Sequence, residues 1–274
     1  MAAKIALSRI PVGYRVWERL GLFKHGTMER PRYALGVFRK HFDRSGLTGC
    51  ADGFSVVEIG PGDTLSTAVI AKALGGTRCW LVDADAFARP DAQPYRDLVD
   101  SLRESGLRVD GLEAFATRDE LLAACGAAYL TRGVASLAEI PDASVDFIFS
   151  HAVLEHIPRH HFARLASEMR RILKPGRIAS HAVDLKDHLG GYLNNLRFSE
   201  RVWESDFMAR SGFYTNRIRF SEMLGHFRNA GFDCEVVRTC RFTGLRPART
   251  AMAKPFREMS DDDLLISDFE VVLR

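Results

Sequence analysis

The sequence contains no long apolar run and no cysteine pair of the kinds that define membrane, secreted or zinc-binding proteins. None of its stretches reaches the 18 or more apolar residues of a membrane span, and its amino terminus lacks the apolar core of a signal peptide. The five cysteines are scattered, odd in number and without a C-x-x-C pair, which argues against a disulfide framework and a zinc site. We therefore expect a cytoplasmic protein without a membrane span.

The charge of the chain is also small, since its formal net charge at pH 7 is only +3 over 274 residues. This value is too low to predict a nucleic-acid surface by itself. Residues 1–50 nevertheless carry ten Lys or Arg and three Asp or Glu. This basic segment is either a solvated face or a surface that meets an anionic substrate or a membrane.

The first 50 residues contain one clear helical pattern. An apolar stripe is formed by Tyr33, Val37, Phe38 and Phe42, and the helix is expected to end near Gly46. We interpret residues 1–50 as a helical cap and residues 51–274 as the main domain. Packing against that domain is the alternative role of this segment.

The chain is organised around residues 56–85. An apolar run that includes Val56 and Val57 ends in the turn Gly60-Pro61-Gly62, which opens a helix, and a second apolar run ends at Asp83. This order predicts a strand–turn–helix–strand unit. The glycine turn and Asp83 then lie at the carboxyl ends of the two strands, where open α/β sheets bind ligands. Two glycines allow close approach to a ligand, and an acid about 20 residues further along suits a ribose.

The nucleoside that such a turn binds depends on the residues around it. A dinucleotide fingerprint requires glycine at the position of Leu65, and Asp63 would place an anion near a pyrophosphate. Glu58 instead suits a ligand with a sulfonium or ammonium group. This stretch resembles the first motif of the class I S-adenosylmethionine-dependent methyltransferases, although Thr64 stands where many members have a third glycine.

A second region strengthens the resemblance. The segments Ile140-Pro141, Val145-Asp146, Leu154-Glu155-His156-Ile157 and Arg170 to Gly176 are similar, in order and spacing, to later motifs of that family. The resemblance covers roughly residues 54–185 and implies a doubly wound, seven-stranded, mostly parallel sheet with an antiparallel edge strand. We expect helices around residues 95–102, 121–125 and 162–173, and strands at 109–114, 145–150, 177–185, 232–241 and 269–274.

The resemblance also implies a set of cofactor-binding residues. Glu58, Gly60 and Gly62 would hold the methionine end of S-adenosylmethionine, and Asp83 would hold the ribose. Ser136 and Leu137 would flank the adenine, although family members often have an aspartate at the position of Ser136. Ser150 and His151 would lie beneath the sulfonium and face the acceptor.

Methyl transfer to an alcohol also requires a base, because the hydroxyl proton must leave. His181 and Asp184, near the end of the 177–185 strand, are candidates for this base and its partner. His151 is a competing candidate for the base. Asp184 and Asp187 with one histidine could instead hold a divalent metal. Loop capping is the structural alternative, and it is the role we expect for His156.

Residues 186–220 have the composition of a substrate lid. Aromatic, amide and guanidinium groups are dense there, and such groups suit a sugar or another polyhydroxylated acceptor. A packed helical lid held by the same groups is the alternative. The candidate substrate residues are Asn194, Asn195, Arg197, Tyr214 and Arg217.

The sequence thus predicts transfer of a methyl group from S-adenosylmethionine to a hydroxyl of a small molecule or glycan precursor, with S-adenosylhomocysteine as product. The alternatives are N-methylation of a small molecule, RNA or protein, and an inactive scaffold that keeps the cofactor fold. No nucleic-acid partner is expected, because the segment from Ser150 to Val153 replaces the N/D-P-P-Y motif of many amine and base methyltransferases. A homodimer remains open.

Overall fold

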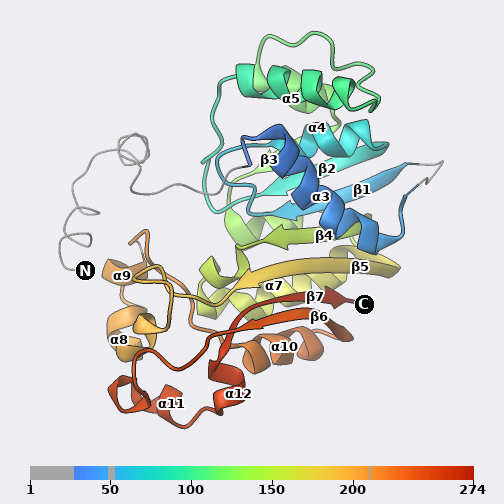
Figure 1. The fold of residues 1–274 in the computed structure, drawn as a ribbon. Helices are drawn as coiled ribbons and strands as arrows, with labels where there is room; N and C mark the ends of the chain where they lie inside the picture. The colour runs from blue at the N-terminus through green and yellow to red at the C-terminus, as the bar shows by residue number, and fades with distance from the viewer. Residues whose placement is uncertain (1–27, 49–52, 210) are drawn as a thin grey trace.

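The computed structural model describes residues 28–48, 53–209 and 211–274. Its centre is a seven-stranded sheet in the order β3-β2-β1-β4-β5-β7-β6 (Figure 1). β7 is antiparallel to both of its neighbours, and the strands from β3 to β5 are parallel. The strands are β1 Phe54–Ile59, β2 Gly76–Val82, β3 Ala127–Leu130, β4 Val145–His151, β5 Leu173–Asp184, β6 Cys234–Arg241 and β7 Ile266–Leu273. The predicted doubly wound sheet with an antiparallel edge is confirmed.

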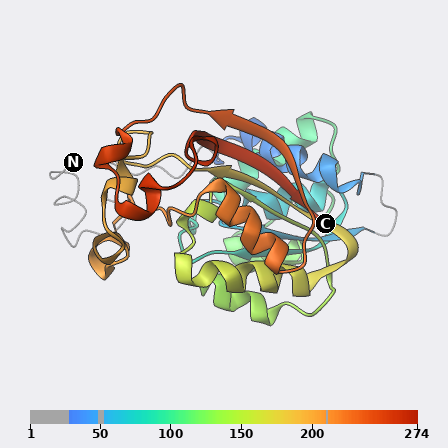
Figure 2. The ribbon, with the colours of Figure 1, turned by 90° about the horizontal axis from the view of Figure 1, so that it is seen from below.

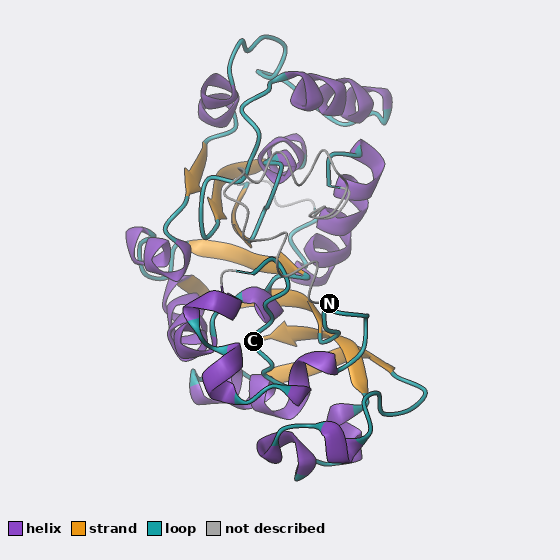
Figure 3. Cartoon of the chain, turned by 90° about the vertical axis from the view of Figure 1, so that its left-hand side faces the viewer, coloured by secondary structure: helices purple, strands orange, loops and turns teal. Residues whose placement is uncertain are grey.

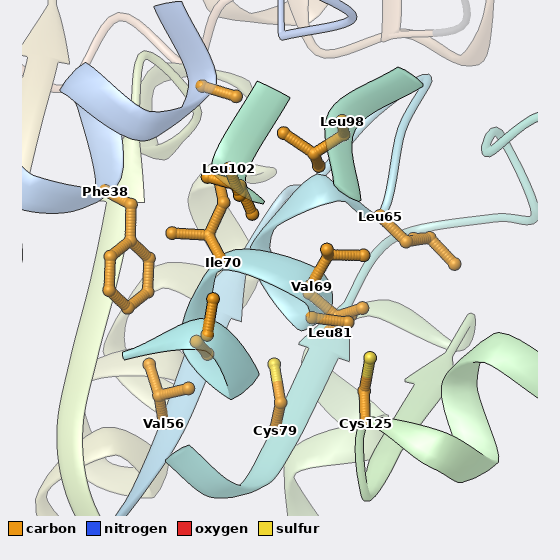
Figure 4. Close-up of a cluster of buried hydrophobic side chains, with 14 of the residues drawn as sticks. Phe38, Val56, Leu65, Val69, Ile70, Cys79, Leu81, Leu98, Leu102 and Cys125 are labelled. Carbon is orange, nitrogen blue, oxygen red and sulfur yellow. The ribbon is translucent and has the colours of Figure 1, made fainter. Parts of the chain in front are cut away.

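Helices cover both faces of this sheet (Figure 2). One face is covered by α3 Pro31–Ser45, α4 Ser66–Ala73, α5 Gln93–Glu104 and α6 Arg118–Ala124, and the other by η1 Gly133–Glu139, α7 Arg159–Ile172 and α10 Phe220–Asn229. Figure 4 shows part of the first layer, with side chains of α3, α4 and α5 packed on β1 and β2. Each fully buried Leu or Phe in these layers contributes about 1.5–3 kcal/mol to stability.

The first described helix, α3, starts with a proline and ends where Gly46 takes φ 69°, a left-handed conformation that suits glycine. Ala34, Phe38 and Phe42 are buried in the same core as α4 and α5. The prediction that Tyr33 belongs to the buried stripe is wrong, because Tyr33 is one position off that face and is 42% exposed. The rest of the predicted cap lies in residues 1–27, outside the described residues.

One predicted strand is absent from the described fold. Residues 109–114 form turns, in which Leu112 donates its N–H to the carbonyl of Val109 at 3.0 Å. Both side chains are buried in the core, so the apolar pattern reflects packing and not a strand ladder. The place beside β2 is taken by Ala127–Leu130, which the sequence pattern did not reveal.

The segment after β5 folds beyond the carboxyl end of that strand into short helices. These are η3 Asn194–Arg197, α8 Glu200–Trp203 and α9 Asp206–Ala209, and they gather with the later η4 Arg249–Ala251, α11 Lys254–Arg257 and α12 Asp261–Leu264 near one end of the sheet (Figure 3). Leu193 and Leu196 pack against Met252, Phe256 and Leu264. The predicted lid region is therefore built from two segments, of which sequence analysis found only the first.

No helix in the described part of the chain is long and apolar enough to cross a membrane.

Candidate functional site at the carboxyl edge of the sheet

The loop after β1 needs glycine at its first position. Gly60 has φ 75° and donates its N–H to the carbonyl of Val82 at 2.8 Å. A Cβ atom at this position would lie 2.4 Å from a methyl group of Val153, closer than any ordinary contact. Glycine is therefore required here by the positive φ and by the close approach of Val153, in the segment that follows β4.

Asp83 connects the loops that follow three neighbouring strands. Its two carboxylate oxygens accept the N–H of Gly62 at 2.9 Å and the N–H of Ala84 at 2.8 Å, and its carbonyl accepts the N–H of Gly133 at 2.7 Å. A carboxylate has about four acceptor positions. Asp83 therefore holds the glycine loop in place at the end of β2, and its contact with a ribose stays a prediction.

Glu58 is a buried acid in the strand that leads into this loop. One of its carboxyl oxygens has no hydrogen-bond partner among the described residues. Burial, with a smaller contribution from the charge of Asp83, raises the pKa of Glu58 to about 8. An unpartnered buried carboxyl oxygen is costly unless a donor or a cation satisfies it. Together with the open glycine turn and Asp83, it fits a nucleoside cofactor that carries a positive centre.

The predicted adenine residues lie inside η1. The Ser136 hydroxyl accepts the N–H of Arg132 at 2.9 Å, and the Leu137 carbonyl accepts a guanidinium N–H of Arg171 at 2.8 Å. Both side chains are fully buried. Since η1 is joined to Asp83 through Gly133, it belongs to the site, but direct adenine contact by these two residues stays a prediction.

Ser150 and His181 form a buried pair on the α10 side of the sheet. The Ser150 hydroxyl lies 2.8 Å from Nδ1 of His181, while Nε2 of His181 has no hydrogen-bond partner in the part of the chain that the structure describes. The His181 ring lies parallel to Phe227 of α10, with centroids 5.9 Å apart. Burial lowers the pKa of His181 to about 3, so this ring is neutral and lies in the core, away from a solvent-borne acceptor.

Because His181 is buried in its neutral form, we expect the stability of the folded protein to fall as the pH is lowered. The folded pKa of His181 lies below its unfolded value of 6.5, so the unfolded chain binds more protons and the stabilisation is lost as pH falls from 6.5 towards 3. At pH 5 the loss from this group is about 2 kcal/mol, at 1.36 kcal/mol per pH unit. Urea unfolding at pH 7 and pH 5 should show a weaker pH dependence for His181→Leu. The control His160→Leu, at an exposed histidine, should leave the pH dependence of the free energy of unfolding unaltered. An equal pH dependence in the wild type and in His181→Leu would contradict the prediction.

His151 lies at the end of β4, on the opposite face from His181. The register pairs Ile59 with Ser150, which sets His151 opposite Gly60. Its Nδ1 atom lies 3.2 Å from Nε2 of His41. Burial and the charge of Lys40 lower the pKa of His151 to about 4, so the ring is neutral although part of it is exposed.

Asp184, the third predicted catalytic residue, pairs with Lys186 at the end of β5. Its carboxylate accepts the N–H of Lys186 at 2.9 Å and lies 2.8 Å from the Lys186 ammonium. Asp187 instead caps the next turn, where it accepts the N–H of Leu189 at 2.7 Å. Across the described residues, no group of three or more His, Cys, Asp or Glu side chains could hold a metal ion.

Four of the five predicted substrate residues make hydrogen bonds within the lid region. The side-chain amides of Asn194 and Asn195 donate to Asp187 and Thr215, at 3.2 and 2.9 Å. The Tyr214 hydroxyl donates to Glu204 at 2.7 Å, and the Arg217 guanidinium donates to the Phe198 carbonyl at 2.7 Å. The fifth, Arg197, is exposed. These contacts favour the packed-lid interpretation, and substrate contact stays a prediction.

Two buried polar residues near this edge, His41 and Glu155, have no role predicted from the sequence. His41 of α3 is fully buried between Ser180 and His151. Glu155, in η2 Leu154–His156, has one carboxyl oxygen without a hydrogen-bond partner within residues 28–48, 53–209 and 211–274, and burial raises its pKa to about 8. The signal for His41 was present, because it falls on the apolar stripe between Phe38 and Phe42.

Comparison with known proteins agrees with this geometry. Residues 57–180 match the family model described as methyltransferase domain. No curated protein sequence matches the chain significantly.

Similar solved structures share low sequence identity with the chain. The arsenic(III) S-adenosylmethionine methyltransferase from Chlamydomonas reinhardtii has a TM-score of 0.47 at 16% identity, covering 99% of this chain and 72% of that one. A SAM-dependent methyltransferase from Archaeoglobus fulgidus has a TM-score of 0.46 at 12% identity, with 89% and 94% covered. Phosphoethanolamine N-methyltransferase 2 from Haemonchus contortus, in complex with S-adenosyl-L-methionine, has a TM-score of 0.46 at 14% identity, covering 85% of this chain and 51% of that one.

The sheet order, the glycine loop and the acid at the end of β2 define a Rossmann-like nucleoside-binding fold. Together with the match over residues 57–180, this fold supports a class I S-adenosylmethionine-dependent methyltransferase. It is an enzyme that transfers a methyl group from S-adenosylmethionine. The nature of the methyl acceptor is the remaining question.

Proposed function

We propose that this methyltransferase acts on an oxygen atom of a small molecule or glycan precursor, which enters at the carboxyl edge beside residues 186–220. The supporting observation is the position of His151, a neutral and partly exposed imidazole opposite Gly60 at the end of β4. His181 is enclosed and Asp184 is paired with Lys186, so His151 is the best placed of the three predicted residues to touch the acceptor.

The remaining parts of the site have separate roles. The glycine loop, Glu58 and Asp83 would bind and orient the cofactor, which supplies an activated methyl group. Catalysis then depends mainly on aligning the acceptor with the carbon–sulfur bond. The neutral His151 ring can either take the proton of a hydroxyl or donate a hydrogen bond to an oxygen that is already negative. A divalent metal is not required by either role.

Calorimetric titration with S-adenosylmethionine and S-adenosylhomocysteine, with and without magnesium, is the first test. We expect micromolar dissociation constants for both and no magnesium effect. Formation of S-adenosylhomocysteine should then be measured with panels of hydroxyl, carboxylate and amine compounds. Turnover confined to amines would contradict the proposal in favour of N-methylation. Absence of cofactor binding would favour the scaffold alternative.

A further inference from the structure

His41 is a buried residue whose ring nitrogens are both engaged. Its Nδ1 atom lies 2.9 Å from the Ser180 hydroxyl of β5, and its Nε2 atom lies 3.2 Å from Nδ1 of His151. The ring stacks on Phe149, with centroids 5.3 Å apart and an interplanar angle of 29°. His41 is therefore held in one orientation between β5 and the carboxyl end of β4.

Arg44, one turn further along α3, sets the direction of this hydrogen-bond chain. A guanidinium group can only donate, and Arg44 donates to the Ser180 hydroxyl at 3.3 Å. The same hydroxyl has His41 Nδ1 as its other partner. The hydrogen-bond chain from Arg44 through Ser180 and His41 to His151 thus begins at a group that can only donate.

Two proton arrangements are compatible with two neutral imidazoles. If His151 carried its proton on Nδ1, His41 would donate to Ser180. The Ser180 hydroxyl would then accept two hydrogen bonds, and the described residues offer no other acceptor for its own proton. If His41 carries its proton on Nε2, then Ser180 donates to His41 and His41 donates to His151. Ser180 and His41 then each accept one hydrogen bond and donate one, and His151 accepts the last of them at Nδ1. Buried polar groups favour such complete satisfaction.

We propose that Arg44, Ser180 and His41 are positioning residues that hold His151 with its proton on Nε2, so that His151 donates a hydrogen bond to an anionic acceptor oxygen such as a carboxylate. In an imidazole the two nitrogens lie on different sides of the ring, so Nε2 points away from His41. A protonated Nε2 cannot accept the proton of an alcohol. This inference rests on the proposed function and narrows its acceptor from any oxygen to a negatively charged one.

The surrounding charge agrees with an anionic acceptor. Lys40, which is near enough to lower the pKa of His151, also pairs with the buried Glu270 of β7 at 2.5 Å. Arg44 and Arg238 contact the same carboxylate, so three cations surround it. Glu270 acts on His151 in the opposite direction, but Lys40 and Arg44 are two cations against this one carboxylate, and the excess positive charge on the α3 side would favour the approach of a carboxylate towards His151.

Methyl transfer to a carboxylate needs no base. A lone pair of the carboxylate oxygen forms the new bond to the methyl carbon, the carbon–sulfur bond breaks, and its electron pair goes to sulfur. The negative acceptor and the positive sulfonium become a neutral ester and a neutral thioether, and no proton moves. His151 holds the acceptor by hydrogen bonding and keeps its own proton throughout.

Nitrogen NMR of the histidine-labelled full-length protein tests the tautomer directly. The signals of His151 are assigned by their loss in His151→Gln. We expect a protonated Nε2 and an unprotonated Nδ1 in the free enzyme. A bare Nε2, or a doubly protonated ring, at neutral pH would overturn the inference. This measurement needs neither cofactor nor acceptor, so its result is independent of whether the proposed function holds.

Substitution at Ser180 tests the chain behind His151. Ser180→Ala removes the donor to His41, and we expect the His151 signals to report a mixture of tautomers. Ser180→Thr keeps a hydroxyl and should restore the single form. A role limited to packing would leave the tautomer unchanged in Ser180→Ala, and that result would overturn the assignment of Ser180 and Arg44 as positioning residues.

Anion recognition has its own probe. With S-adenosylhomocysteine bound, titration with acetate should shift the Nε2 resonance of His151, whereas ethanol at the same concentration should not. A response to ethanol equal to that of acetate, or no response to acetate, would overturn the carboxylate preference. Failure of S-adenosylhomocysteine to bind would already appear in the calorimetry and would count against the proposed function instead.

Discussion

Replacing Gly60 by alanine is expected to reduce the affinity for S-adenosylmethionine by at least roughly 100-fold, which corresponds to about 2.7 kcal/mol. The new Cβ atom would lie 2.4 and 2.5 Å from the two methyl groups of Val153, and φ 75° is strained for any residue with a side chain. The loop must therefore move away from β4, which disturbs the hydrogen bonds of Gly60 to Val82 and of Gly62 to Asp83 that hold the predicted cofactor loop in place. Calorimetric titration with the cofactor measures the loss.

Gly36→Ala is the matched control for this substitution. Gly36 lies within α3, and nothing lies within 4 Å of a Cβ atom built there. Alanine should leave cofactor binding unchanged and stabilise the helix by about 0.5–1 kcal/mol. The double substitution Gly60→Ala with Val153→Ala should recover part of the affinity, because it removes the clash and leaves the backbone strain. Wild-type affinity in Gly60→Ala alone would show that the loop does not hold the cofactor.

Asp83→Ala is expected to lower the cofactor affinity by a similar factor, through two losses. The variant loses the predicted contacts to the ribose, and the N–H of Gly62 loses its carboxylate acceptor at 2.9 Å. Hydrogen bonds to a charged group contribute about 1.5–3 kcal/mol each. A catalyst should lose activity with this affinity, whereas a scaffold should keep its cellular role.

Asp85→Ala is the control for Asp83, because Asp85 is an exposed acid two residues further along that also accepts a backbone N–H, from Ala86 at 2.7 Å. Its loss should leave cofactor affinity within about twofold, because exposed groups contribute little. Thermal unfolding of both variants separates loop disorder from lost ligand contacts. Equal affinities in the two variants would remove Asp83 from the binding site.

The sequence predicted those parts of the molecule that depend on neighbouring residues. The loop between β1 and α4, the strand ending at Asp83 and the helix α5 each follow from patterns within about a dozen residues. The resemblance to a known family supplied the order of the sheet. β3 escaped prediction because its four residues are only half-buried and show no alternation.

The hydrogen-bond chain behind His151 could not be predicted in the same way. His41 and His151 are 110 residues apart, and His41 and Ser180 are 139 apart, so their contacts depend on how α3 is placed on the sheet. The choice between His151 and His181 also required the structure. These two residues lie on opposite faces of adjacent strands, and only the structure shows that His181 is fully buried whereas His151 is partly exposed.

The position of β7 has a consequence for the order in which the protein can form during synthesis. β7 lies between β5 and β6, and its Glu270 pairs with Lys40 and Arg44 of α3, about 230 residues earlier. Until residues 266–273 leave the ribosome, β5 has one unpaired edge and these two cations lack their carboxylate. A nascent chain that already contains the complete cofactor loop therefore cannot complete its sheet until β7 has been synthesised. We expect chaperones to bind the chain during this interval.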